Sequence, residues 1–216
     1  LSIWGLAWPS IIANILFAAV GIVGLKAVGA LGTEALAAVG TGQRIFFVIQ
    51  SLIMAVSTGT TALIARAYGS GKKNEAAQVL FDSLWIGVIL GLCTTFIVWI
   101  YGEDIIGLFG LNEQSKNLAI DYLKYSMLFS AMFSASFIFG AALRAAGDAK
   151  TPLVIMIFQN IINVFLLIGL VNGSFGLPNL GVLGAALAWG ISFTIGTIIF
   201  LFLWLSKLTI IPFPNF

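Results

Sequence analysis

Five stretches of this sequence hold no charged residue, and their lengths limit what the chain can fold into. The runs extend over residues 1–25, 45–65, 83–102, 125–143 and 151–206. Each of the first four is about 20 residues long, which suits one helix across roughly 30 Å of hydrocarbon. The fifth is too long for one span and is divided by a turn-forming segment at residues 172–179. The sequence therefore predicts six membrane-spanning helices.

The composition supports a membrane protein. The chain of 216 residues is 60% hydrophobic and 8% charged, whereas an ordinary soluble domain is about 25% charged. The net charge of +2, with basic residues placed between hydrophobic runs, argues against nucleic acid as a partner. The single Cys93 excludes a disulfide within the chain, and the lack of histidine removes the usual metal ligand and proton shuttle. We expect no metal site and no organic cofactor.

The helices predicted for this all-α, polytopic protein form one unit over residues 1–216. Their expected bounds are roughly 3–28, 35–65, 77–101, 117–143, 152–171 and 182–206. Basic residues in short loops are retained on the cytoplasmic side, and this bias places both ends of the chain in the cytoplasm. Aromatic residues near the helix ends are interpreted as interfacial anchors: Trp4, Trp8, Trp99, Tyr101, Tyr122, Tyr125 and Trp204. The lipid bilayer of the plasma or inner membrane is thus an expected partner.

Two polar segments between apolar runs are interpreted as turns on the same side of the membrane. In the later one, Arg144 and Lys150 bring positive charge to a helix end, Gly147 suits a left-handed C-cap, and Pro152 suits the first turn of the next helix. The earlier segment has similar spacing and is predicted to have the same design. Its structural residues are Arg66, Gly69 and Lys72.

Four glycine-rich strings resemble a known transporter family in their order and spacing. They lie at residues 29–40, 58–72, 143–152 and 176–186, and together they are similar to the multidrug and toxic compound extrusion (MATE) family. The resemblance implies a twelve-helix antiporter, driven by protons or sodium, that exports small organic or xenobiotic compounds through a cleft between two six-helix lobes. This chain resembles the N-terminal lobe. We expect a trimmed fragment whose C-terminal lobe, part of the same polypeptide, is absent.

The resemblance also locates two carboxylate positions that this chain does not fill. Many members carry one acid on the first helix and another on the fifth helix, one turn after an asparagine. Here Asn163 matches the asparagine, but the acid positions fall on Gly24 and Leu167. The coupling ion, H⁺ or Na⁺, is therefore expected to bind mainly in the C-terminal lobe.

Three amides in the fifth predicted helix are candidate pathway residues. Gln159 and Asn163 are four residues apart, and Asn160 and Asn163 are three apart, so the spacing predicts one shared polar face. Such a face serves either hydrogen bonding between helices or contact with a substrate or ion.

Lys26 and Arg44 are the other candidates for the substrate and ion pathway. The long side chain of Lys26 can carry its ammonium to the outer interface, and Arg44 begins the second apolar run at the same boundary. If both instead face an outward-open cleft, they make it electropositive and favour anionic or neutral cargo.

Other function classes remain as alternatives. A lipid-linked precursor flippase of the same superfamily also uses glycine-rich helical lobes, and a membrane scaffold that does not transport is a further possibility. An enzyme is not expected, because the uncharged runs contain no carboxylate and the chain has no histidine. The sequence thus predicts no catalytic residues.

Overall fold

The structure is a computed structural model that describes residues 3–214. Within this range the chain forms helices and no strands. The helices are α1 (Ile3–Gly29), α2 (Thr33–Gly69), α3 (Lys73–Gly107), α4 (Glu113–Leu128), α5 (Ser130–Ala145), α6 (Lys150–Asn172) and α7 (Gly181–Leu205).

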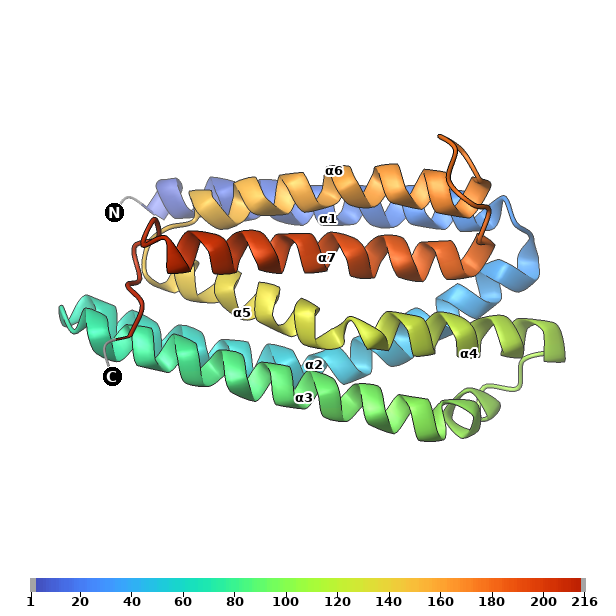
Figure 1. Ribbon diagram of the computed structural model, residues 1–216, viewed down its shortest axis with the longest axis horizontal. Helices are drawn as coiled ribbons and strands as arrows, with labels where there is room; N and C mark the ends of the chain where they lie inside the picture. Colours follow the sequence, from blue (N-terminus) through green and yellow to red (C-terminus); the bar gives the residue numbers. More distant parts are fainter. Residues whose placement is uncertain (1–2, 215–216) are drawn as a thin grey trace.

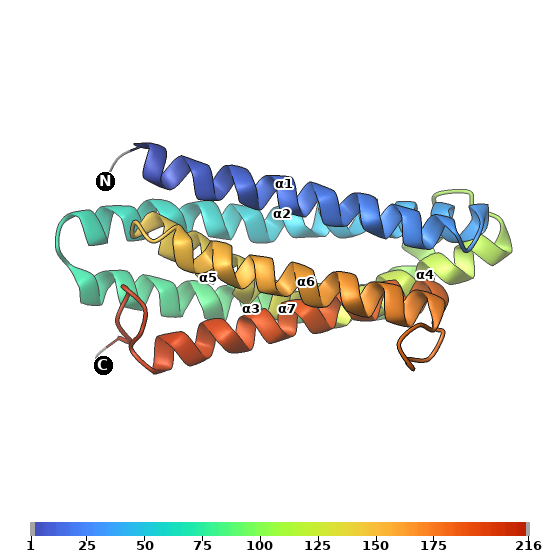
Figure 2. The same ribbon diagram turned by 90° about the horizontal axis from the view of Figure 1, so that it is seen from above.

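The helices run side by side along one long axis and form an elongated bundle (Figure 1). α6 packs against α1 and α7, while α2 packs against α3, α4 and α5. α7 contacts α4 and α5 and so joins the two groups. A second view, turned by 90°, shows the same alignment of the helices along this axis (Figure 2).

The connections of the bundle are divided between its two ends. The α2–α3 turn, the α5–α6 turn and the segment after α7 lie together at one end, which we call the basic end (Figure 1). Its basic residues are Arg66, Lys72, Lys73, Arg144, Lys150 and Lys207. The α1–α2, α3–α4 and α6–α7 connections lie at the opposite end (Figure 1).

The six predicted membrane spans are confirmed. α1, α2, α3, α6 and α7 are each long and apolar enough to cross a membrane, and α4 with α5 forms a bent pair that qualifies as a sixth span. α2 has 37 residues, which corresponds to about 55 Å at 1.5 Å per residue. α3 has 35 residues. Both helices therefore extend beyond the hydrocarbon, and beyond the expected ranges 35–65 and 77–101, because their polar ends can stay helical in water.

The expectation of one unbroken helix at residues 117–143 is wrong. The chain bends by 52° between α4 and α5 at Phe129. The Thr95 hydroxyl of α3 donates a hydrogen bond to the Met127 carbonyl, and the Phe129 ring occupies space over Gly190 of α7. A side chain from a neighbouring helix that takes a carbonyl from the helical ladder is an established cause of kinks.

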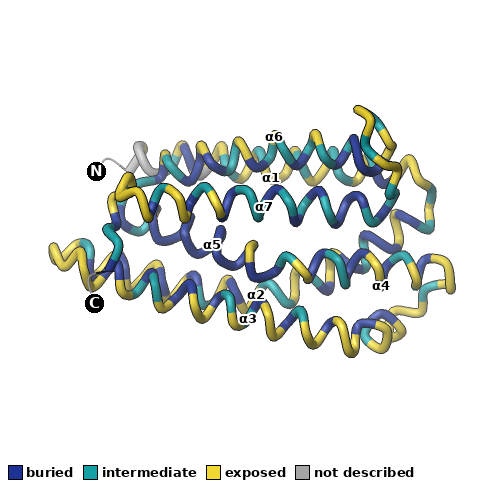
Figure 3. Tube along the Cα trace, in the orientation of Figure 1, coloured by how far each residue is buried: buried dark blue, intermediate teal, exposed yellow. Residues whose placement is uncertain are grey.

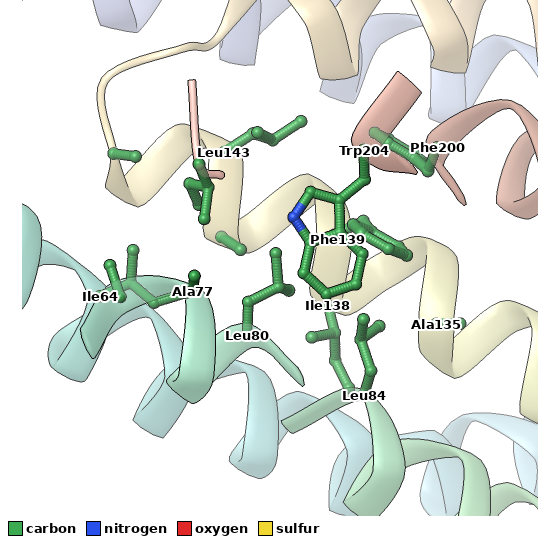
Figure 4. Packing of buried hydrophobic residues seen from close by; sticks show 14 of the residues in the cluster. Ile64, Ala77, Leu80, Leu84, Ala135, Ile138, Phe139, Leu143, Phe200 and Trp204 are labelled. Atoms are coloured by element: carbon green, nitrogen blue, oxygen red, sulfur yellow. The ribbon is translucent and has the colours of Figure 1, made fainter. Parts of the chain in front are cut away.

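A cluster of buried hydrophobic residues fills the interior near the basic end (Figure 4). Phe139 of α5 stacks on Phe200 of α7, with ring centroids 5.5 Å apart and an interplanar angle of 4°. Trp204 meets Phe139 edge-on at 5.4 Å, and its Nε1 donates to the Pro212 carbonyl at 3.0 Å. These contacts hold the segment after α7 against the bundle.

Two of the expected aromatic anchors are instead part of the interior. Trp204 is 3% exposed and Tyr122 is 8% exposed, so their assignment to the membrane interface is wrong. Tyr122 lies against Gly42 of α2, where a Cβ would collide with the tyrosine ring. Trp204 is covered by Phe139 of α5 and by the segment after α7.

Large hydrophobic side chains cover much of the outer surface, as expected for contact with lipid. Exposed residues are frequent on α1 and on the outer faces of α2 and α3 (Figure 3). They include Phe17, Ile22, Phe47, Val48, Phe96 and Ile97. A soluble protein rarely exposes so large an apolar surface.

Glycine permits close approach between helices at specific points. A Cβ on Gly91 of α3 would lie 2.6 Å from the Cα of Ala131 in α5. One on Gly184 of α7 would collide with the Leu170 carbonyl of α6. These contacts agree with the general role of small residues in membrane helix packing.

Candidate functional site

Two of the three candidate amides on α6 face the interior of the bundle. Gln159 is 5% exposed and Asn163 is 8% exposed. The Gln159 Nε2 donates to the Ser136 Oγ of α5 at 3.0 Å, and Gly196 of α7 leaves the space that the Gln159 amide occupies. Asn163 makes no side-chain hydrogen bond to another described residue. Gln159 is therefore fixed by packing, whereas Asn163 keeps its hydrogen-bonding capacity.

The third amide, Asn160, lies on the side of α6 that is next to α1. It lines an apolar cavity of about 460 Å³ between α1 and α6, together with Leu16 and Val20 of α1. Its Nδ2 is buried and has no hydrogen-bond partner in the described part of the chain. At about 100° per residue, Gln159 and Asn160 lie within one arc of α6 that also contains Asn163.

The two positions where the resemblance implied carboxylates are neighbours in space. A Cβ on Gly24 of α1 would lie 3.9 Å from Cδ2 of Leu167 on α6. Leu167 is 5% exposed and belongs to a cluster with Val28 of α1 and Leu170 of α6. The contact between Gly24 and Leu167 is therefore apolar, and neither described residue supplies a carboxylate.

Lys26 and Arg44 are both exposed. Lys26 lies in the last turn of α1, close to the opposite end of the bundle. Arg44 lies 11 residues after the start of α2, about 16 Å along that helix. Neither forms an ion pair with a described residue. The exposure of both cations agrees with an interfacial position and equally with a cleft completed by another part of the protein.

The two polar turns differ in detail from the predicted common design. Gly147 has a φ of +98°, as expected for the left-handed cap after α5. In the earlier turn the left-handed residue is Gly71, with a φ of +79°, whereas Gly69 is the last residue of α2. The Lys72 side chain is paired with Glu75 at 3.1 Å. Gly69 therefore does not have the role that Gly147 has, and the prediction of a common design is wrong at this residue. The reason is that α2 continues two residues beyond the position that corresponds to the end of α5.

The turn after α5 also prepares the start of α6. Asp148 Oδ1 accepts hydrogen bonds from the backbone N–H groups of Lys150 and Thr151, at 3.1 and 3.0 Å. Pro152 lies in the first turn of α6, where its missing N–H costs no helical hydrogen bond.

Sequence reasoning missed the residues that neighbouring helices contribute to the site. Ser136 and Gly196 position Gln159 but have no distinctive sequence pattern. A polar groove between α2 and α5 was also missed. It has a volume of about 330 Å³ and is lined by Ser57, Thr58, Thr61 and Arg144, among others. No group of three or more His, Cys, Asp or Glu that could hold a metal occurs in residues 3–214.

Comparison with known proteins identifies the family to which this sequence is similar. The sequence matches the family profile described as MatE over residues 9–168. It is 31% identical over 192 residues to a probable multidrug resistance protein NorM of Thermotoga maritima, which covers 88% of this chain and 41% of that protein. It is 34% identical over 203 residues to the probable multidrug resistance protein YoeA of Bacillus subtilis, covering 92% of this chain and 43% of that protein.

Solved structures share the fold. A transporter of the MOP superfamily from Pyrococcus furiosus superposes with a TM-score of 0.90 at 24% identity, over 98% of this chain and 46% of that one. The outward-facing conformation of a multidrug resistance MATE family transporter gives the same TM-score, identity and coverage.

These observations define a multi-pass membrane protein built as one helical bundle. The chain belongs to the MatE family, which confirms the resemblance inferred from its glycine-rich strings. It spans 41% and 43% of the lengths of the two relatives named above.

Proposed function

We propose that this chain is the N-terminal lobe of a cation-coupled antiporter that exports small organic or xenobiotic compounds. The MatE match over residues 9–168 carries the proposal, because the named relatives at 31% and 34% identity are multidrug resistance proteins. A second lobe, supplied by the same polypeptide, completes the cleft. A flippase for lipid-linked precursors has less support, since neither of these relatives is named as one.

The interior of the lobe supplies hydrogen bonds to the cargo without a change of charge. Asn163 is buried and makes no side-chain hydrogen bond to another described residue, so its amide is the group best placed to meet a polar atom of the substrate. Gln159, already bonded to Ser136, supports this part of α6. Asn160 contributes a second contact through the apolar cavity beside α1.

Ion coupling is assigned mainly to the second lobe. A proton-driven step requires a group within the membrane that changes charge during the cycle, and buried carboxylates are the usual choice. The apolar contact between Gly24 and Leu167 provides no such group. Lys26 is exposed in the last turn of α1, outside this contact. H⁺ or Na⁺ therefore binds mainly outside this lobe.

We infer the orientation of the protein in the membrane from the distribution of its basic residues. The basic end faces the cytoplasm, because Lys and Arg in short loops are retained on that side during insertion. The protein is thus placed in the plasma or inner membrane with both ends of this segment inside.

A transport assay tests the proposal. The natural full-length protein is produced in a bacterial strain that lacks its major drug exporters, and the cells are loaded with ethidium. The proposal predicts faster loss of ethidium fluorescence than in cells with the empty vector, and a slower loss once the ion gradients are collapsed. Identical efflux in both strains across a panel of cationic and neutral compounds would refute it.

A further inference from the structure

The groove between α2 and α5 contains a cation that lacks a counter-charge. Arg144 in the last turn of α5 lines this groove together with Ser57, Thr58 and Thr61 of α2. The nearest acid along the chain, Asp148, is used by the backbone of α6 through its Oδ1. No carboxylate of a described residue lies within 4.0 Å of the Arg144 guanidinium. The ion pairs in the described range join Lys72 to Glu75 and Lys124 to Glu103.

The Arg144 side chain is not needed to cap its own helix. The N–H of Asp148 reaches back to the Leu143 carbonyl at 2.8 Å, and the N–H of Gly147 reaches the Arg144 carbonyl at 3.0 Å. These backbone bonds satisfy the end of α5 in the manner of a Schellman motif. The guanidinium and its five donors are therefore available to another group.

The Arg144 side chain also runs back along α5, away from the basic end, and remains exposed in the lobe. Its Nη1 lies 3.1 Å from the position that a Cβ on Gly140 would occupy, one helical turn further from the basic end. A basic side chain at a membrane boundary ordinarily extends towards water. Here the missing Cβ of Gly140 lets the guanidinium lie along α5, beside the groove.

The hydroxyls on the α2 wall complement this cation. Thr58 and Thr61 donate to the carbonyls of Met54 and Ser57, at 2.9 and 2.8 Å, so each oxygen keeps lone pairs for a donor from a ligand. The Ser57 hydroxyl makes no hydrogen bond to any other residue in the described range, and it can donate. The groove thus combines donors for an oxyanion with acceptors for a hydroxyl or amine.

We propose that this groove binds a phosphate group, and that the phosphate belongs to an anionic phospholipid such as phosphatidylglycerol. Arg144 and Ser57 contact the phosphate oxygens, while Thr58 and Thr61 accept from the glycerol hydroxyls. Five further basic residues at the basic end raise the local concentration of anionic lipid. Basic pockets between membrane helices are a known way to recognise such headgroups. This site is separate from the amides of α6.

Lipid binding by the purified full-length protein tests the proposal. Fluorescently labelled phosphatidylglycerol is titrated in detergent and followed by fluorescence anisotropy. Arg144→Gln is expected to weaken binding about tenfold or more, the effect of losing a charged hydrogen-bonding partner. Lys150→Gln, at the same end but outside the groove, is the matched control and should bind as the wild type does.

Competition identifies the source of the phosphate. Displacement of the label by unlabelled phosphatidylglycerol, but not by inorganic phosphate, supports a lipid site. Displacement by both supports the phosphate site but shows that a soluble phosphate compound can also fill it. Equal binding by the wild type and Arg144→Gln, or an equal loss in Lys150→Gln, would overturn the proposal. Size-exclusion profiles of each variant confirm that a loss of binding does not come from unfolding.

Discussion

Gly24 of α1 and Leu167 of α6 face each other across an apolar contact, with 3.9 Å between an ideal Gly24 Cβ and the Leu167 Cδ2. Helix α1 contacts α6 and makes fewer contacts with α2 and α7, so this contact is important for holding α1 in the lobe. It also removes charge from the place where the family resemblance implied a pair of acids.

Truncation of Leu167 is expected to loosen the attachment of α1. Leu167→Ala removes a buried side chain and leaves a cavity, which typically costs about 2–5 kcal/mol. Gly24→Ala should stay within about 1 kcal/mol of the wild type, since its Cβ meets Leu167 at an ordinary contact distance. Thermal unfolding in detergent, followed by tryptophan fluorescence, measures both. A larger loss for Gly24→Ala than for Leu167→Ala would contradict this packing.

A methyl group at Gly196 is expected to disturb the Gln159 site. The added Cβ would overlap the Gln159 amide, so the amide must move and lose its 3.0 Å bond to Ser136. Overpacking of this kind costs about 1–3 kcal/mol. Gly196→Ala should therefore lower the apparent melting temperature, whereas Gly40→Ala, with no atom within 4 Å of its Cβ, should not. Equal melting curves for the two variants would show that α6 and α7 are less closely packed than described.

The bend at Phe129 is expected to depend on Thr95. Thr95→Val removes the hydroxyl that donates to the Met127 carbonyl and leaves that carbonyl without this partner, at a cost of about 1–3 kcal/mol. Thr194→Val is the matched control, because Thr194 bonds only to the Gly190 carbonyl within its own helix. Stability of Thr95→Val equal to that of Thr194→Val would show that the bend has another cause.

Labelling with an impermeant thiol reagent tests the orientation. In a Cys93→Ala background, cysteines placed at the exposed positions Ser70 and Lys150 should react only after the cells are opened, because both positions lie at the basic end. A cysteine at Phe175, which is exposed in the α6–α7 connection, should react in intact cells. The reverse pattern would show that the basic end faces outwards.

Much of the fold could be predicted because it depends on local composition. The uncharged runs gave the six spans, and Gly147 and Pro152 marked a turn whose backbone conformation the structure confirms. The bend at Phe129 could not be predicted, because it depends on Thr95, more than thirty residues earlier in the sequence. The full extent of α2 was missed for a different reason. Charged residues end the uncharged run, but the helix itself can continue past them where its surface is in contact with water.

The candidate site was predicted only in part. In the structure Gln159 and Asn163 are buried, and Asn160 lines the apolar cavity beside α1. Periodicity gives the angle of a residue around its own helix and does not show where the neighbouring helix lies. Arg144 was predicted as a turn residue. Its guanidinium lies along α5 beside a groove, in the space that the missing side chain of Gly140 leaves, and no sequence pattern indicates this contact.

On the proposed function, this lobe recognises cargo through Asn163 while ion coupling resides mainly in the second lobe. The most direct test is the pH dependence of transport by Asn163→Ala in the full-length protein, reconstituted in proteoliposomes, with Lys26→Ala measured beside it. The account predicts that Asn163→Ala raises the KM for substrate and leaves the pH dependence of the rate unchanged. It would be contradicted if Asn163→Ala removed the pH dependence, or if Lys26→Ala abolished ion coupling while substrate binding stayed intact.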